Sequence, residues 1–284
     1  MRRKKWYLAP WVLGLLVIIL PISESASSVP NYYFNAQSKY LGVYPDYGNC
    51  TYGNRSCTLY CDKIEPYLQA KGYSRASKWY DRQTSPRDLS DDYGNMRIWA
   101  GHGIDYTSPE GVRQGNESAA HFFNYDYNNY HPLTDHGNPA CNVSWSEIRW
   151  GHINPYNDGV DYAVMYTCNF LNCNVWAWGN LNKLFQMFEG MHLMVGFASK
   201  MYINPDEGAW FGYYLQNNYT IKNAWITAAQ KYQYQIGTTP TVYAAWIGHV
   251  NHENDTLAIH ADPPWYINTF GTWNYAYRTY RVAN

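Results

Sequence analysis

The chain has 284 residues, which is long enough for one large α/β domain or two small ones, and 46% of them are hydrophobic, which argues against global disorder. The formal net charge of −1 gives no reason to expect nucleic acid or another anionic surface as a partner. Aromatic residues make up 18% of the chain, with 30 Tyr and 13 Trp, and such side chains suit both an aromatic-rich core and contact with glycans.

The N-terminus has the layout of a targeting segment. Four basic residues, Arg2–Lys5, precede the apolar run Trp6–Leu20, and small residues follow over Ser23–Ser28. We therefore predict a signal peptide or uncleaved N-terminal anchor over residues 1–28 and a single domain over 29–284. The mature protein is expected to be secreted or extracytoplasmic, touching a membrane only through this segment.

Glycosylation sequons and cysteines agree with export. Asn-x-Ser/Thr sequons occur at Asn49, Asn54, Asn116, Asn142, Asn218 and Asn254. The six cysteines form an even set, which in an oxidising compartment predicts disulfides. Cys168 is either a thiol, which leaves an odd number for pairing, or a partner of Cys173 or Cys141.

Strand and helix patterns alternate after the N-terminal segment. The predicted strands are Lys39–Tyr44, Ala76–Tyr80, Met96–Ala100, Tyr162–Thr167, Met191–Phe197 and Thr241–Ile247. The predicted helices are Thr58–Lys71, Leu181–Glu189, Gly208–Gln216 and Thr220–Tyr234. Gly72 and Gly190 can end two of these helices, and Thr220 stands at an N-cap. The segment Trp265–Val282 alternates aromatic and polar residues, as a hairpin or edge ribbon would.

This alternation predicts an α/β fold with a mostly parallel sheet covered on both faces, a three-layer αβα sandwich. The polar, Asn- and Tyr-rich stretch at about 104–161 is too long for a simple connection. We predict that it is an insertion over the sheet edge, with Val143–Trp150 as its ordered part.

Two apolar strands end on chemically capable residues. Met96–Ala100 runs into Gly101-His102-Gly103, and Tyr162–Thr167 runs into Cys168. Parallel strands present their carboxyl ends at one edge of a sheet, where reactive groups gather. A thiol and an imidazole at that edge form a candidate nucleophile and acid/base pair, although each residue alone is more typical of a turn or a packed core.

These two blocks resemble the caspase–gingipain–legumain group of cysteine peptidases, clan CD. The matching residues are Trp-Ala-Gly-His-Gly, ending at Gly103, and Val-Met-Tyr-Thr-Cys-Asn, which contains Cys168. The resemblance implies a caspase-like sheet, with Cys168 as nucleophile, His102 as acid/base, and the amides of Gly103 and Cys168 as oxyanion donors. It implies a peptide or protein substrate and no cofactor or metal. The chain also resembles an exported family of unknown function that shares these blocks.

Two features near the C-terminal half have competing interpretations. Asp206 and Glu207 follow a predicted strand and could line a specificity pocket, or they could be exposed loop carboxylates. His249 and His252, together with His260, suggest a zinc site, but no Cys or clear carboxylate completes the set, so no metal is expected. His192 lies in an apolar strand and is predicted to be a core histidine.

A function of another class also fits the composition. The chain could be a catalytically inactive exported glycoprotein of the same fold, acting as a binding or surface-assembly protein through its Tyr, Trp and Asn residues. Rapid labelling of Cys168 by a thiol reagent would favour the peptidase hypothesis over this one.

Overall fold

The computed structural model describes residues 30–36, 43–44, 48–49, 57–80, 94–104, 119–121, 142–144, 148, 150, 159–173, 183–234, 241–257 and 275–283. The predicted signal segment, residues 1–28, lies outside these ranges. Within them, every helix is too short or too polar to cross a membrane.

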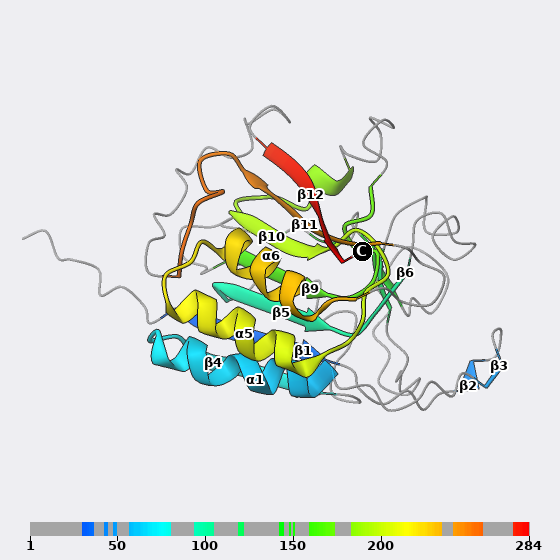
Figure 1. Cartoon of the computed structure of the whole chain (residues 1–284), viewed down its shortest axis with the longest axis horizontal. Helices are drawn as coiled ribbons and strands as arrows, with labels where there is room; N and C mark the ends of the chain where they lie inside the picture. Colours follow the sequence, from blue (N-terminus) through cyan, green and yellow to red (C-terminus); the bar gives the residue numbers. More distant parts are fainter. Residues whose placement is uncertain are drawn as a thin grey trace, which may run out of the picture.

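A seven-stranded mixed sheet organises the described part of the chain (Figure 1). Its strands are β1 Asn31–Ala36, β4 Ser74–Tyr80, β5 Met96–Ala100, β9 Tyr162–Tyr166, β10 Leu193–Phe197, β11 Val242–His249 and β12 Tyr275–Ala283. The order across the sheet is β12-β11-β10-β9-β5-β1-β4. The five strands from β4 to β10 run parallel, and β11 is antiparallel to both of its neighbours. The α/β class is confirmed.

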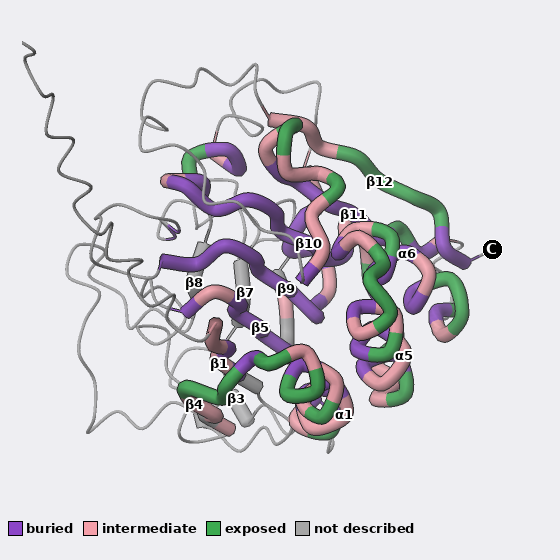
Figure 2. The backbone as a smooth tube through the Cα atoms, turned by 90° about the vertical axis from the view of Figure 1, so that its left-hand side faces the viewer, coloured by how far each residue is buried: buried purple, intermediate pink, exposed green. Residues whose placement is uncertain are grey.

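The central strands are apolar because both of their faces are covered. All five residues of β5, of β9 and of β10 are buried, and Figure 2 shows these strands as continuous buried tubes. Strands buried on both faces read as unbroken hydrophobic runs rather than as alternating patterns. This is why the sequence predicted these three strands within one or two residues.

The first strand of the main sheet differs from the prediction. It is β1, Asn31–Ala36, between β4 and β5, whereas the prediction was Lys39–Tyr44. Val43–Tyr44 forms β2, which pairs with β3, Gly48–Asn49, in a separate two-stranded sheet. Tyr32 and Phe34 are fully buried in β1, but tyrosine and asparagine neighbours hide this period-two pattern from a search for aliphatic runs.

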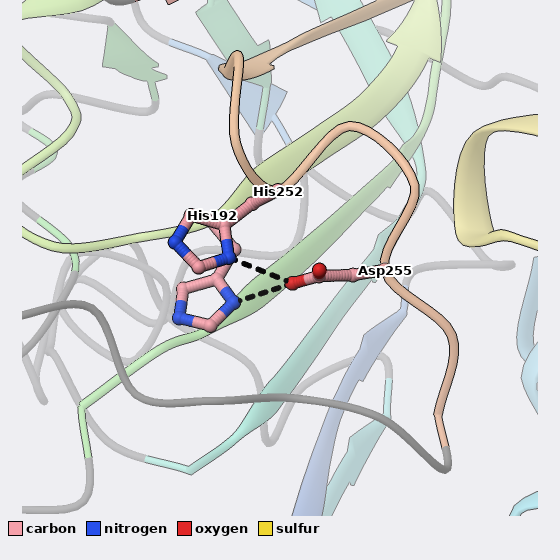
Figure 3. A group of neighbouring side chains, drawn as sticks. All are labelled: His192, His252 and Asp255. Atoms are coloured by element: carbon pink, nitrogen blue, oxygen red, sulfur yellow. Dashed lines mark hydrogen bonds and ion pairs between the residues drawn. The ribbon is translucent and has the colours of Figure 1, made fainter.

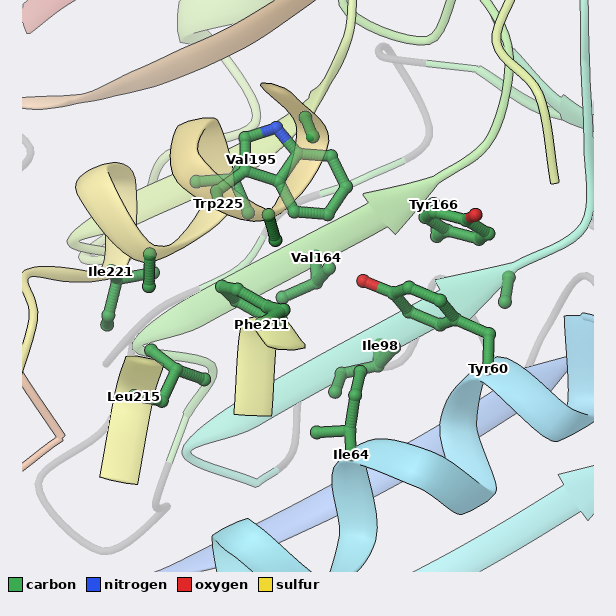
Figure 4. Close-up of a cluster of buried hydrophobic side chains, with 14 of the residues drawn as sticks. Tyr60, Ile64, Ile98, Val164, Tyr166, Val195, Phe211, Leu215, Ile221 and Trp225 are labelled. Carbon is green, nitrogen blue, oxygen red and sulfur yellow. The ribbon is translucent and has the colours of Figure 1, made fainter. Parts of the chain in front are cut away.

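Three helices cover one face of the sheet (Figure 1): α1 Cys57–Ala70, α5 Pro205–Gln216 and α6 Ile221–Tyr232. Helix α1 ends where Gly72 adopts a φ of 87°, and α6 begins where the Thr220 hydroxyl accepts a hydrogen bond from the Asn223 amide. Side chains from all three helices pack against the central strands, as Figure 4 shows for Tyr60, Phe211 and Trp225.

The opposite face is covered, in the described residues, by irregular segments. Its core contains Trp99, Ile148, Trp150, Val160, Ala163, Met165, Phe170, Leu171, Leu184, Phe185, Met187, Phe188, Met191, Met194, Ala245 and Ile247. The helix predicted over Leu181–Glu189 is helical only at 183–185 among these residues. It stops because the Trp150 amide donates to the Met187 carbonyl (2.9 Å) and the Glu189 amide donates to the Trp150 carbonyl (2.8 Å).

The predicted insertion contains a small antiparallel sheet of its own. Its strands are β6 His102–Ile104, β7 Ala119–His121 and β8 Asn142–Ser144. Strand β6 starts directly after β5, so the insertion is anchored where β5 leaves the main sheet. At the other side of the main sheet, β12 forms the edge that the aromatic–polar alternation predicted; residues 265–274 lie outside the described ranges.

Candidate functional site

The two predicted strand ends leave the same edge of the sheet. Strands β5 and β9 are parallel neighbours, with Ala100 opposite Tyr166, and the Gly101 amide donates to the Tyr166 carbonyl at 3.2 Å. The segments that carry His102 and Cys168 therefore emerge side by side. We call this end of the sheet the carboxyl edge.

Gly103 contacts the backbone of Cys168 directly. A Cβ atom built on Gly103 would lie 1.9 Å from the Cys168 carbonyl oxygen and 2.5 Å from Thr167 Oγ1, so only glycine fits without a shift of backbone. His102, one residue earlier, belongs to β6, and its side chain lies outside the described part of the structure. The glycine predicted beside the histidine thus brings the two chain segments into contact.

A turn with fixed backbone hydrogen bonds holds Cys168. After it, Asn169 adopts a left-handed φ of 58°, which asparagine tolerates better than most residues. The Asn169 amide donates to the Ser199 carbonyl (2.9 Å), and the Leu171 amide donates to the Phe197 carbonyl (3.0 Å). These bonds join the turn to the end of β10, so Cys168 sits on a rigid element rather than on a long loop.

The sulfur of Cys168 is half-buried and is contacted by Met201. The Met201 amide lies 3.4 Å from Sγ and donates to it, and the thiol lies 3.7 Å from the Met201 carbonyl. Both contacts come from the backbone of Met201, so they fix the position of the sulfur at the end of the turn.

Cys168 and Cys173 both carry thiols, so the structure does not contain the disulfide considered between them; Cys141 lies outside the described residues. Burial raises the pKa of Cys173 to about 12, and burial raises the pKa of Cys61 well above its usual value. These two thiols are chemically quiet at neutral pH.

The two carboxylates predicted as pocket residues face different surroundings. Asp206 is 57% exposed and pairs with Lys63, whereas Glu207 is fully buried in the first turn of α5. Glu207 is therefore not an exposed loop carboxylate. Burial raises its pKa to about 8, although the side chains of Gln233 and Tyr166, which donate to it, oppose the shift. It lies beneath the carboxyl edge, as a neutral acid at pH 7.

A second cluster of polar side chains lies at the opposite, amino edge of the sheet (Figure 3). His192 precedes β10, while His252 and Asp255 lie in the turn after β11. Asp255 Oδ2 is 2.7 Å from His192 Nδ1 and 3.1 Å from His252 Nδ1. Strand β10 separates this cluster from the carboxyl edge by its five residues, roughly 16 Å of extended chain.

Sequence reasoning missed Asp255 and gave His192 no partner. His192 is fully buried, as predicted, but its ring is bonded to a carboxylate 63 positions away. A usable signal was the spacing of His249, His252 and Asp255, three residues apart within one turn. His260, the third histidine of the zinc hypothesis, lies outside the described residues.

Two of the six sequon asparagines have described side chains, and both are exposed: Asn218 and Asn254. Asn49 and Asn142 have only their backbone described, in strands β3 and β8. Asn54 and Asn116 lie outside the described residues.

Comparison with known families identifies the family to which the chain belongs but no activity. Residues 46–268 match the family described as a domain of unknown function, DUF6345. Because the match covers well over half of the chain, the chain belongs to this family. No curated protein shows significant similarity to it.

Proposed function

We propose that this member of the DUF6345 family is an exported cysteine peptidase that hydrolyses peptide bonds with a Cys168–His102 dyad. The observation that carries the proposal is the contact between Gly103 and the Cys168 carbonyl at the carboxyl edge. It supports the dyad because His102 is adjacent to Gly103 in the chain, so the backbone that carries His102 lies close to Cys168.

The fold part of the proposal is a caspase-like three-layer sandwich. Five parallel strands followed by an antiparallel β11 support the sheet, and α1, α5 and α6 supply one helical layer. The second covering layer of the proposed sandwich is irregular in the described residues. Across the sheet the parallel strands follow the order β4-β1-β5-β9-β10, so the second strand of the chain lies outside the first. In doubly wound sheets of this order, ligands bind outside the carboxyl ends of the first and third strands. Those two strands are β1 and β5, and His102 follows β5.

The proposed reaction uses covalent catalysis. His102 takes the thiol proton as Cys168 Sγ attacks the carbonyl carbon of the peptide, and the amides of Gly103 and Cys168 bind the oxyanion. His102 then returns the proton to the leaving amine. Water hydrolyses the resulting thioester, releasing the acid and restoring the thiol.

Thiol labelling tests the proposal with an internal control. We expect iodoacetamide at pH 7 to modify Cys168 at least about 10-fold faster than Cys173, whose pKa is about 12, when sites are assigned by peptide mass mapping. His102→Ala should slow labelling of Cys168 alone. Equal rates at the two cysteines, or a disulfide at Cys168, would contradict the proposal.

Hydrolysis supplies the second readout. On a library of fluorogenic peptides, Cys168→Ala should lower turnover at least about 10³-fold while the melting temperature stays within a few degrees. Cys173→Ala is the matched control and should keep its turnover.

One observation favours the alternative, an inactive exported glycoprotein that binds a partner. Tyr202 and Tyr234 are exposed, and their ring centroids lie 4.3 Å apart next to Met201. Exposed paired tyrosines suit glycan contact. Under this alternative, a glycan array retains a ligand that Tyr234→Ala no longer binds, and Cys168 labels slowly.

Export itself is open to a direct test. Mass spectrometry of protein recovered from the culture medium should show a mature N-terminus close to residue 28, whereas an anchored form keeps residues 1–28 and stays with the membrane fraction.

A further inference from the structure

We propose that His192, His252 and Asp255 form a binding site for one divalent transition-metal ion of the zinc class, at the amino edge of the sheet. This site is independent of the proposed peptidase chemistry, because it lies at the other end of β10 from Cys168. It replaces the zinc hypothesis built on His249, His252 and His260: His192 and Asp255 complete the donor set.

The three donor atoms already converge. One ligand atom from each residue lies within 4.8 Å of the other two, and Figure 3 shows both histidine Nδ1 atoms facing the same carboxylate oxygen. Donor atoms around a tetrahedral zinc ion are about 3.3 Å apart, given zinc bonds of about 2.0–2.1 Å. The distances from Asp255 Oδ2 to the two Nδ1 atoms are 2.7 Å and 3.1 Å, so they need to open by about 0.6 Å and about 0.2 Å.

The backbone around the cluster is fixed by the sheet and by α6. The His249 amide donates to the His192 carbonyl at 3.0 Å, which pins the turn after β11 to the start of β10. The Ile221 amide, at the start of α6, donates to the Asp255 carbonyl at 2.9 Å. The Tyr162 hydroxyl donates to Asp255 Oδ2 at 3.0 Å. Supporting bonds of this kind orient metal ligands and raise their affinity.

The polar contacts of Asp255 suit a cation site. Its Oδ2 atom lies within hydrogen-bond distance of the Tyr162 hydroxyl and of both histidine Nδ1 atoms, so one carboxylate oxygen already faces both proposed nitrogen ligands. His192 Nε2 is buried without a hydrogen-bond partner among the described residues, so it can take the ring proton when a metal occupies Nδ1.

The donor set also indicates which metal ion the site prefers, and the exposure of the ligands shows how solvent reaches it. Two imidazole nitrogens and one carboxylate oxygen suit zinc and its neighbours, and three protein ligands leave a fourth position for water. The side chains of His252 and Asp255 are each 12% exposed, which leaves solvent a path to one side of a cluster whose third member, His192, is fully buried. Magnesium and calcium, which prefer oxygen ligands, are disfavoured.

Zinc titration of the full chain tests the site. We expect chelator-stripped protein to bind Zn²⁺ in calorimetry with one ion per chain and a Kd at or below about 1 µM. His252→Gln should weaken binding at least about 10-fold. Glu253→Gln is the matched control, because Glu253 lies in the same turn but its carboxylate pairs with Lys222. This variant should bind Zn²⁺ as tightly as the unaltered chain.

Cobalt separates this site from any site that uses cysteine. Co²⁺ bound to the unaltered chain should give the visible absorption of nitrogen and oxygen ligation, without the thiolate charge-transfer band. If His252→Gln does not fold, Asp255→Asn takes its place in the titration. Failure of the unaltered chain to bind Zn²⁺, a thiolate band with cobalt, or equal affinity in the His252 and Glu253 variants would overturn the proposal. None of these outcomes depends on peptidase activity.

Discussion

The two edges of the sheet each contain a shielded carboxyl group, fully buried at Glu207 and partly buried at Asp255, and their acidities are opposite. At the carboxyl edge, burial raises the pKa of Glu207 to about 8. At the amino edge, the hydrogen bonds from two histidines overcome the effect of burial and lower the pKa of Asp255 to about 2. Glu207 receives its hydrogen bonds from the neutral side chains of Gln233 and Tyr166. A partner that can carry positive charge decides which form of a buried acid is stable.

This difference separates what each edge can do. A neutral acid beneath the carboxyl edge adds no negative charge to that edge, and a negative charge near a sulfur disfavours its thiolate. A carboxylate held between two imidazoles is instead a ready ligand for a cation. The two proposals thus assign a nucleophile to the edge with the neutral acid and a metal to the edge with the carboxylate.

Replacing Glu207 tests the comparison with the largest expected effect. Because its pKa is raised from 4.5 to about 8, the folded chain keeps a proton that the unfolded chain releases between these values. Its stabilising contribution is full below pH 4.5 and is lost as pH rises through 8. Between pH 5 and 8 we expect the free energy of unfolding to fall by up to on the order of 4 kcal/mol relative to Glu207→Gln.

Urea unfolding at several pH values measures this slope. Asp206→Asn, at the exposed neighbour, is the control and should change the free energy of unfolding by less than about 0.5 kcal/mol at each pH. If the free energy of unfolding changed with pH equally in Glu207→Gln and in the unaltered chain, the pKa of Glu207 would not be raised, and the contrast in acidity between the two edges would disappear.

Replacing Asp255 probes the other edge. Asp255→Asn removes the charge that accepts hydrogen bonds from His192, His252 and Tyr162, so we expect a loss of about 3 kcal/mol of unfolding free energy. Urea unfolding with a chelator present measures this loss without any contribution from bound metal. Glu253→Gln in the same turn should cost less than about 1 kcal/mol. A similar loss of unfolding free energy in both variants would show that the hydrogen bonds of Asp255 do not stabilise this edge more than an ordinary surface ion pair does.

Gly103→Ala should disturb only the carboxyl edge. Its Cβ would meet the Cys168 carbonyl oxygen at 1.9 Å, so the backbone on one side must move. Under the proposed peptidase function, a displacement of this order should lower turnover about 10²-fold, measured with the best fluorogenic peptide. Gly212→Ala on α5 is the control: it presses on the Tyr67 ring, lowering stability but leaving turnover per folded molecule unchanged.

The sequence predicted those parts of the fold whose signals are local. Strands β5, β9 and β10 are unbroken apolar runs, and Thr220 supplies a helix cap that needs no distant partner. The pairing of the two strand ends also followed from local patterns, because parallel neighbours share an edge. Strand β1 was missed because its buried residues are a tyrosine and a phenylalanine between polar neighbours.

The remaining features depend on contacts between distant segments. Asp255 meets His192 only after β11 has paired with β10 in antiparallel register. Glu207 is buried because α5 packs on α1 and Gln233 returns over it from the end of α6. The histidine spacing next to Asp255 points to a polar cluster but not to His192, and no pattern next to Glu207 shows its burial, so residue type alone could not assign the state of either acid.

The helical hairpin of α5 and α6 is fastened at both edges. The Asn204 amide, at the N-cap of α5, donates to the Tyr166 hydroxyl (2.8 Å), and the amide at the start of α6 donates to Asp255. At the far end of α6, the Gln233 side chain donates to the Tyr202 carbonyl (2.8 Å). Because the segment is secured at each end, we expect its amide hydrogens to exchange with solvent more slowly than those of a helix that is bonded at one end only. The hairpin thus links the two edges mechanically, although the edges differ in chemistry.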